Sequence, residues 1–189
     1  MKRALIDWLG RLLVVAPISC ASAEFVLAAC VEPEPQDYRM SQYRSATPCT
    51  LKGGTVVTVE EVQSLHNQEG ALLIDVLPAP RRPKNFPADS IWLPKSRWNI
   101  PGSVWLANAG LGVLPVEEER HFREHLARLT NGDKSRKLVL YCLANCWMSW
   151  NAAKRAIEWG YSAVYWFPEG TNGWTLEGLA LEENKPLPL

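Results

Sequence analysis

Short apolar runs bounded by turn residues recur along the chain and predict the strands of a sheet. Residues 71–76 form a continuous apolar run broken only by Asp75, which is typical of a strand covered on both faces. Residues 137–142 and 163–167 form two further runs of this kind. Shorter strands are expected at residues 55–58 and 101–106, each next to a glycine turn.

Helical periodicity separates these runs. Thr58 and Glu61 form a capping box, which predicts a helix beginning there. A second helix is expected after Pro115, with an apolar stripe at Phe122, Leu126 and Leu129. A third is expected beyond the cysteine-containing loop after residue 142, with apolar positions at Ala152, Ala153, Ala156 and Ile157. Strand and helix in alternation predict an α/β domain with a largely parallel sheet.

Three stretches lack such periodicity. Residues 24–52 contain closely spaced prolines and predict an extended lead-in. Residues 77–100 hold five prolines and five Lys or Arg, and a loop of this length inside a domain is usually functional or disordered. Residues 169–174 predict a turn, followed by a short closing piece at 175–181.

The composition fits one domain with a substantial core. The chain has 189 residues, of which 47% are hydrophobic and 21% charged, values that argue against disorder. Because the formal net charge is zero, total charge gives no support for nucleic-acid binding.

The first 23 residues are typical of an export signal. Positive charge precedes the apolar stretch 12–19, and Ala21-Ser22-Ala23 is an A-x-A cleavage site. We therefore expect residues 1–23 to be a signal peptide and the protein to be periplasmic. The domain itself is then expected at residues 53–189.

An alternative N-terminal processing remains open. Leu27-Ala28-Ala29-Cys30 matches a lipoprotein box, in which lipid on Cys30 would attach the protein to a membrane. Glu24 interrupts the apolar approach to this box and disfavours it. An uncleaved cytosolic N-terminus is the third and weakest interpretation.

Cysteine counting follows from export. Once Cys20 leaves with the signal, an even set of four cysteines remains, as expected in an oxidising compartment. Cys142 with Cys146 is one expected pair, and Cys30 with Cys49 is the other.

Cys142 is the candidate nucleophile. It follows a buried strand and precedes a helix, where backbone N–H groups converge, and such a position stabilises anions and lowers the pKa of a thiol. The alternative is a buried, inert cysteine. Asp75 and the basic loop after it also follow strand ends, where sites form in parallel sheets.

No metal or cofactor is expected. His121 and His125 are spaced i, i+4 on a helix, but without further ligands a solvated helix face is the favoured interpretation. The cysteines lack a second pair for zinc. Trp147 occupies the place where a c-type haem motif has histidine, and the cysteine spacing also differs.

Four segments carry a resemblance to a known family. They are Leu73-Ile-Asp-Val76, Ile100-Pro-Gly-Ser-Val-Trp105, Leu138-Val-Leu-Tyr-Cys142 with Ala152-Ala153 behind it, and Val164-Tyr-Trp-Phe-Pro-Glu-Gly-Thr-Asn-Gly-Trp174. These segments occur in the same order as in rhodanese-like domains, and the chain resembles such a domain over roughly residues 54–180. The resemblance implies an α/β fold with a central, largely parallel five-stranded sheet flanked by helices.

A narrower resemblance rests on Cys142-Leu-Ala-Asn-Cys146-Trp147 and on Arg39-Met-Ser-Gln-Tyr43. These segments resemble the family named for pyrroloquinoline quinone (PQQ)-dependent catabolism and its CXXCW motif, although three residues, not two, separate the cysteines here. The resemblance implies an exported protein associated with periplasmic quinoprotein alcohol oxidation. A quinoprotein dehydrogenase, a cytochrome or a transporter is the implied partner.

The rhodanese resemblance also implies roles for individual residues. Cys142 would form a persulfide, and residues 142–148 would be the active-site loop. Thiol chemistry, rather than the rhodanese pattern, gives Cys146 its expected role: it would resolve a persulfide, sulfenate or mixed disulfide at Cys142 to a disulfide. A structural disulfide or two free thiols is the alternative. The residues expected to bind substrate are Leu143, Ala144, Asn145, Trp147, Met148, Asp75, Arg81, Arg82 and Arg97. Rhodanese loops usually carry Arg or Lys, and residues 143–148 carry neither, so efficient thiosulfate transfer is not expected.

Two functions from different classes follow. The first is sulfur transfer or thiol–disulfide chemistry at Cys142 and Cys146. The second is a non-catalytic accessory module that binds a periplasmic partner through the tryptophan-rich loop, with the cysteines locked together.

Overall fold

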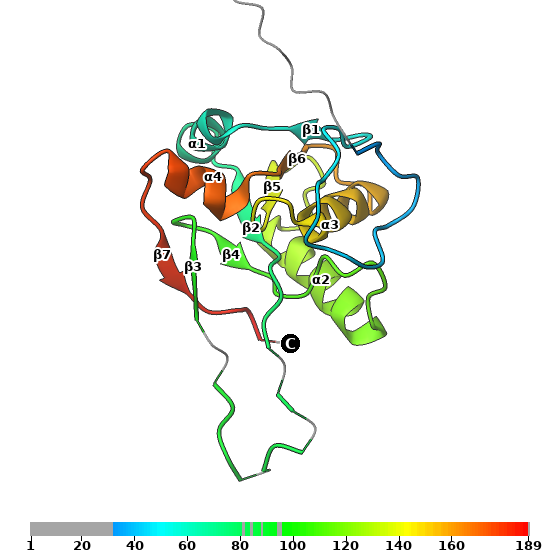
Figure 1. The fold of residues 1–189 in the computed structure, drawn as a ribbon, viewed down its shortest axis with the longest axis vertical. Helices are drawn as coiled ribbons and strands as arrows, with labels where there is room; N and C mark the ends of the chain where they lie inside the picture. Colours follow the sequence, from blue (N-terminus) through cyan, green and yellow to red (C-terminus); the bar gives the residue numbers. More distant parts are fainter. Residues whose placement is uncertain (1–31, 81, 84, 88, 94–95, 189) are drawn as a thin grey trace, which may run out of the picture.

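A computed structural model of the protein describes residues 32–80, 82–83, 85–87, 89–93 and 96–188. The elements in chain order (Figure 1) are β1 (Thr55–Val56), α1 (Val59–Asn67), β2 (Leu72–Asp75), β3 (Arg97–Asn99), β4 (Val104–Trp105), α2 (Val116–Leu129), β5 (Leu138–Tyr141), α3 (Trp147–Glu158), β6 (Val164–Phe167), α4 (Gly170–Leu176) and β7 (Glu182–Asn184).

The main sheet has five parallel strands in the order β1-β6-β5-β2-β4. The predicted α/β class and the five predicted strands are confirmed, although β1 and β4 are only two residues long. β5 lies at the centre, between β6 and β2, so its carboxyl end is the middle one of the five strand ends along that edge of the sheet.

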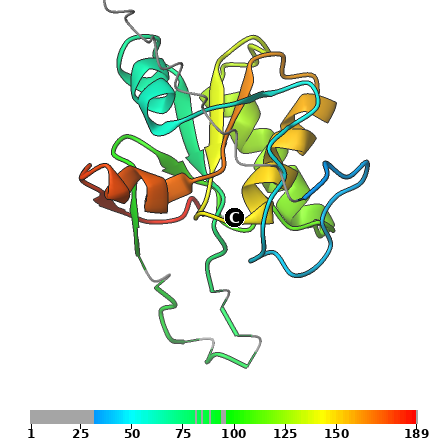
Figure 2. The same cartoon turned by 45° about the horizontal axis from the view of Figure 1, so that its top comes forward.

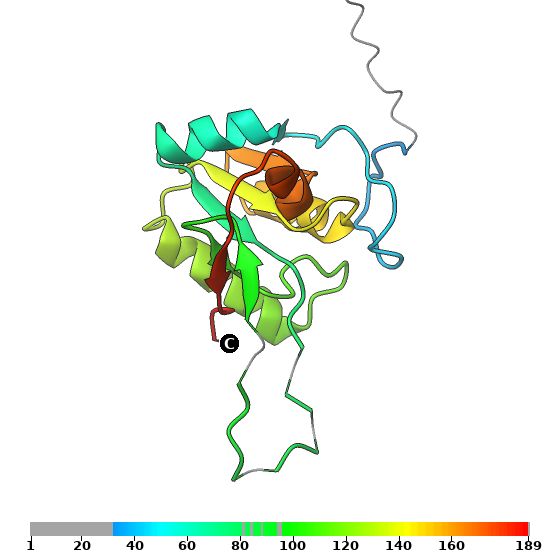
Figure 3. The same cartoon turned by 60° about the vertical axis from the view of Figure 1, so that its left-hand side comes forward.

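Helices cover both faces of this sheet (Figures 2 and 3). Phe122 and Leu126 of α2 pack with α3 on one face, while Val62 of α1 and Trp174 of α4 pack on the other. Neighbouring strand residues alternate between these two cores, so the strands are hydrophobic at nearly every position. The capping box predicted at the start of α1 is present.

Three short elements, α4, β3 and β7, were not predicted. Residues 169–174 do not form a simple turn, because Gly170–Leu176 is the helix α4. The segment 77–100 and the region after 181 are not wholly irregular, since β3 pairs with β7 in an antiparallel ribbon. These short elements carry little periodicity of their own and are held by their contacts with the domain.

The described part of the lead-in, from residue 32 on, is irregular and packs along α3. The side chain of Asn151 accepts a hydrogen bond from the Arg39 backbone N–H and donates one to the Arg39 carbonyl, each at 2.9 Å. The indole of Trp150 donates to the Thr50 carbonyl at 3.1 Å. None of the helices in the described residues is long and apolar enough to cross a bilayer.

Candidate active site

The cysteine loop joins the central strand to α3. Cys142 directly follows β5, and Cys146 is the N-terminal capping residue of α3. A disulfide joins the two residues across a Cα–Cα distance of 6.3 Å, which confirms the predicted pairing. Cys49 is also disulfide-bonded, but its predicted partner, Cys30, lies outside the described residues.

Both cysteines are buried, with Cys142 0% and Cys146 2% exposed. Between them, Leu143 and Ala144 are half-buried and Asn145 is exposed. Asn145 also has a positive φ of 52°, a conformation that asparagine tolerates and that turns the chain back toward the helix. A partner molecule therefore meets residues 143–145 before it meets either sulfur.

Two backbone amides of the loop already have partners within the protein. The N–H of Ala144 donates to Asn172 Oδ1 at 3.0 Å, and the N–H of Trp147 donates to the Tyr43 carbonyl at 2.9 Å. The first amide of α3 is thus capped by the lead-in. The converging N–H groups expected around Cys142 are in part already used, which weakens the site for a small anion.

A buried ion pair stands beside the loop. Asp75, the last residue of β2, is fully buried, and its carboxylate accepts hydrogen bonds from Arg97 Nε at 2.5 Å and from Asn99 Nδ2 at 2.9 Å. Burial raises the pKa of Asp75 to about 6, although the positive charge of Arg97 opposes the shift. Arg97 Nη2 also donates to the Cys142 carbonyl at 3.2 Å.

Arg97 therefore places a cation next to a loop that has none of its own. The sequence alone cannot locate this contact, because Arg97 begins β3, which follows β2 only after a long irregular segment. Among the predicted binding residues, the structure brings together Asp75, Arg97 and the cysteine loop.

The other predicted binding residues lie elsewhere. Arg82 is exposed, donates to the Pro87 carbonyl at 2.8 Å and lies over the Phe86 ring. Arg81 falls outside the described residues. Trp147 and Met148 are buried in the core, and the Trp147 indole donates to the Ala46 carbonyl at 2.8 Å.

Two residues that sequence reasoning did not select hold the loop from α4. The N–H of Thr171 donates to the Cys142 carbonyl at 3.2 Å, and Asn172 binds Ala144 as described above. Gly170 has a φ of 53°, and a Cβ there would lie only 2.4 Å from the Cys142 carbonyl oxygen. The glycine was the available signal, since it marks a close approach of two backbones.

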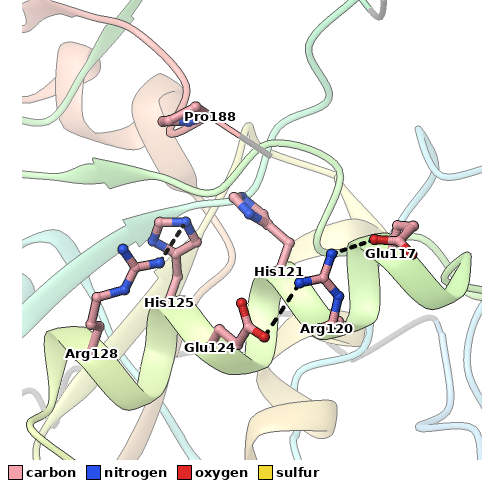
Figure 4. Close-up of a pocket in the computed structure, with 7 residues that line it drawn as sticks. All are labelled: Glu117, Arg120, His121, Glu124, His125, Arg128 and Pro188. Atoms are coloured by element: carbon pink, nitrogen blue, oxygen red, sulfur yellow. Dashed lines mark hydrogen bonds and ion pairs between the residues drawn. The ribbon is translucent and has the colours of Figure 1, made fainter.

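The histidine pair is buried, so the solvated-face interpretation is wrong. His121 is 9% and His125 8% exposed, because the C-terminal residues pass over this face of α2. Figure 4 shows both rings directed toward Pro188, whose backbone forms a hydrogen bond with His125. Among the described residues, no group of three or more His, Cys, Asp or Glu is placed to hold a metal ion.

The chain resembles solved structures of sulfur-transfer proteins. A thiosulfate sulfurtransferase from Pseudomonas aeruginosa matches at 21% identity with a TM-score of 0.48, covering 71% of this chain and 21% of that chain. A polysulfide-sulfur transferase homodimer from Wolinella succinogenes matches at 16% identity with a TM-score of 0.42, covering 69% and 80%. This chain thus spans about a fifth of the Pseudomonas protein.

A family model shows the family of the chain. No curated protein matches the sequence. The model of the rhodanese-like domain matches residues 58–177, from the capping box of α1 to the end of α4, which is more than half of the chain. The chain therefore belongs to the rhodanese-like domain family.

Proposed function

We propose that this protein is an exported rhodanese-like enzyme that accepts sulfane sulfur on Cys142 and resolves it with Cys146. The observation that carries the proposal is the disulfide between these residues at the carboxyl end of the central strand. The two sulfurs are within bonding distance without any rearrangement of the domain, as a nucleophile and its resolving partner must be.

The chemistry has two steps. The thiolate of Cys142 attacks the outer sulfur of thiosulfate or a related donor, sulfite leaves with the electron pair, and Cys142 carries a persulfide. Cys146 then attacks the Cys142 sulfur, the bond to the outer sulfur breaks, and hydrosulfide leaves with the Cys146 proton. The outer sulfur gains two electrons from the two thiols. A dithiol reductant must then return the disulfide to thiols.

The surroundings favour this redox resolution over rapid thiosulfate turnover. The amides of Ala144 and Trp147 are engaged within the protein, and the guanidinium of Arg97 is shared between Asp75 and the Cys142 carbonyl. A doubly charged anion would have to compete with these partners. We expect low turnover with thiosulfate.

The periplasmic setting is part of the proposal. Export is supported by the A-x-A site at residues 21–23, and an association with PQQ-dependent alcohol catabolism by the motifs at residues 39–43 and 142–147. A quinoprotein dehydrogenase, its cytochrome or a transporter is then the partner class.

One observation favours a second function. Both cysteine sulfurs are inaccessible in the disulfide form, since Cys142 and Cys146 are 2% exposed or less. A protein with permanently locked cysteines would serve as a non-catalytic module that binds a periplasmic partner. Reactivity after mild reduction separates the two functions.

The test is sulfide release under single-turnover conditions. Fully reduced protein mixed with thiosulfate should release one equivalent each of sulfite and hydrosulfide while the disulfide forms. Cys142→Ser should release neither, and Cys146→Ser should release sulfite without hydrosulfide. Failure of the wild-type protein to release either product, or of iodoacetamide to label Cys142 after mild reduction, would support the accessory module.

A further inference from the structure

A cavity lies beside α2, and none of its described lining residues belongs to the cysteine loop. It measures about 580 Å³ and is bounded by Ala79 and Pro80 after β2, by Ala107 and Asn108 after β4, and by the C-terminal residues 185–188. Cavities of this size accommodate small organic ligands. Two of its walls leave the carboxyl ends of neighbouring parallel strands, the edge of such sheets where ligands bind.

The walls of this cavity are mainly apolar. Trp92 of the long loop lines it, as do Pro186 and Leu187 of the C-terminal segment. Trp92 is held in place by neighbours in its own loop: its ring packs edge-on against Phe86 at 5.2 Å between centroids, and Arg82 lies over Phe86 at 5.4 Å. An indole side chain presents a flat surface that suits an apolar, ring-sized group.

The charged side chains that line the cavity are all basic. Arg82 and Lys185 line it, and none of its described lining residues is Asp or Glu. His121 is the third basic side chain, and its ring is turned toward the C-terminal segment (Figure 4). Burial, with repulsion from His125 and Arg128, lowers the pKa of His121 to about 4, so near pH 7 its ring is neutral and offers a hydrogen bond without a charge.

We propose that this cavity binds an organic anion with an apolar, ring-sized body, whose negative group lies between Arg82 and Lys185. The apolar body packs against Trp92 and the proline-rich C-terminal segment. The site is built from residues outside the cysteine loop, so it goes beyond the proposed thiol chemistry and does not depend on it.

Fluorescence titration with two matched probes tests this site on the full mature chain. Anilinonaphthalene sulfonate has an aromatic body and one negative charge, and N-phenylnaphthylamine has the same body without the charge. The sulfonate should bind more tightly than the neutral probe. Lys185→Ala should weaken sulfonate binding by about two- to fivefold while leaving the neutral probe unchanged, and Arg82→Ala, which also removes a contact with Phe86, should weaken the sulfonate more than the neutral probe.

Matched variants locate the binding. Trp92→Ala should weaken both probes by about tenfold or more, since the aromatic wall is lost. Trp98→Ala removes an exposed indole of β3, and Arg44→Ala an exposed cation of the lead-in; neither residue lines the cavity, and neither change should matter. The proposal would be overturned if the sulfonate did not bind, or if Trp92→Ala and Trp98→Ala had equal effects. It would also be overturned if Arg82→Ala and Lys185→Ala both left sulfonate binding unchanged. The two charge variants change exposed side chains and keep the test decisive if Trp92→Ala does not fold.

Discussion

Asp75 and Arg97 link the central sheet to the cysteine loop. The carboxylate has no exposure to solvent, while the guanidinium reaches from Asp75 to the Cys142 carbonyl and to the Thr171 hydroxyl at 3.4 Å. The strand ending at residue 75 was predictable from its apolar run. Its ion-pair partner was not, because three basic residues of the long loop were equally eligible by sequence.

Breaking this pair from one side should be costly. Arg97→Met leaves a buried carboxylate without its counter-ion and should lower the free energy of unfolding by about 3 kcal/mol. Asp75→Asn combined with Arg97→Met removes both charges and should recover part of that loss. Urea unfolding of the wild type, the single variant and the double variant measures this; an unchanged midpoint for Arg97→Met would show that the pair contributes no stability.

His121 should give the protein a measurable acid sensitivity. Its pKa is lowered from 6.5 to about 4, mainly by burial. Between these two pH values the unfolded chain is protonated at His121 and the folded chain is not. Acidification from pH 7 to 5 then favours unfolding by up to about 2 kcal/mol from this group. His121→Gln should lose less stability over this range in urea unfolding. The raised pKa of Asp75 has the opposite effect on stability, but this effect is the same in the wild type and in His121→Gln. If stability fell equally with pH in the two proteins, the lowered pKa of His121 would be contradicted.

α4 is the element that fixes the cysteine loop, and its first residue makes the closest backbone approach. Gly170 and Gly178 both have positive φ, at 53° and 72°, but a Cβ at Gly178 would meet nothing within 4 Å. The pair therefore separates backbone strain from steric conflict. An alanine at either position is strained by the left-handed conformation, and only the one at residue 170 also collides with the Cys142 carbonyl.

Gly178→Ala should cost about 1 kcal/mol, the penalty for a left-handed alanine. Gly170→Ala should cost clearly more and should speed reduction of the Cys142–Cys146 disulfide, because α4 has to move away from the loop. Thermal melts and the rate of reduction by dithiothreitol measure both effects. Equal losses in the two variants would mean that the close contact is relaxed at no cost.

Elements with strong periodicity were predictable, and elements defined by contacts were not. The strand at 71–76 and the helix opened by Thr58 follow directly from apolar runs and capping chemistry. The helix α4 begins Gly-Thr-Asn-Gly, a composition that by itself favours a turn, and is held by Thr171 binding Cys142 and by the burial of Trp174. The burial of the α2 histidines was not predictable, because Pro188, which packs against them, lies far from α2 in the sequence.

In the whole molecule, the lead-in is part of the domain although the family match begins only at residue 58. Asn151 holds the Arg39 backbone at both its N–H and its carbonyl, and the carbonyls of Tyr43 and Ala46 accept hydrogen bonds from Trp147. The segment thus caps α3, the helix that begins at Trp147. These hydrogen bonds join residues 39–46 to the helix that directly follows the cysteine pair.

Releasing this segment should expose it to proteolysis. Asn151→Ala removes three hydrogen bonds, of which the one to Gly110 is buried and the two to Arg39 are partly buried. The change should lower the free energy of unfolding by about 1–3 kcal/mol and accelerate tryptic cleavage after Arg39 or Arg44. Asn67→Ala, at the exposed end of α1, serves as the control and should change neither. Unchanged cleavage in Asn151→Ala would show that other contacts suffice to hold the lead-in.

The measurement closest to the central claim is the intact mass of Cys146→Ser after brief exposure to thiosulfate or polysulfide. If Cys142 accepts sulfane sulfur and Cys146 resolves it, this variant should gain the mass of one sulfur atom on Cys142 and keep it until a thiol is added. The reduced wild-type protein treated in the same way should return to the disulfide with no added mass. An unmodified Cys142 in the variant, in protein shown to be folded and reduced, would contradict the account.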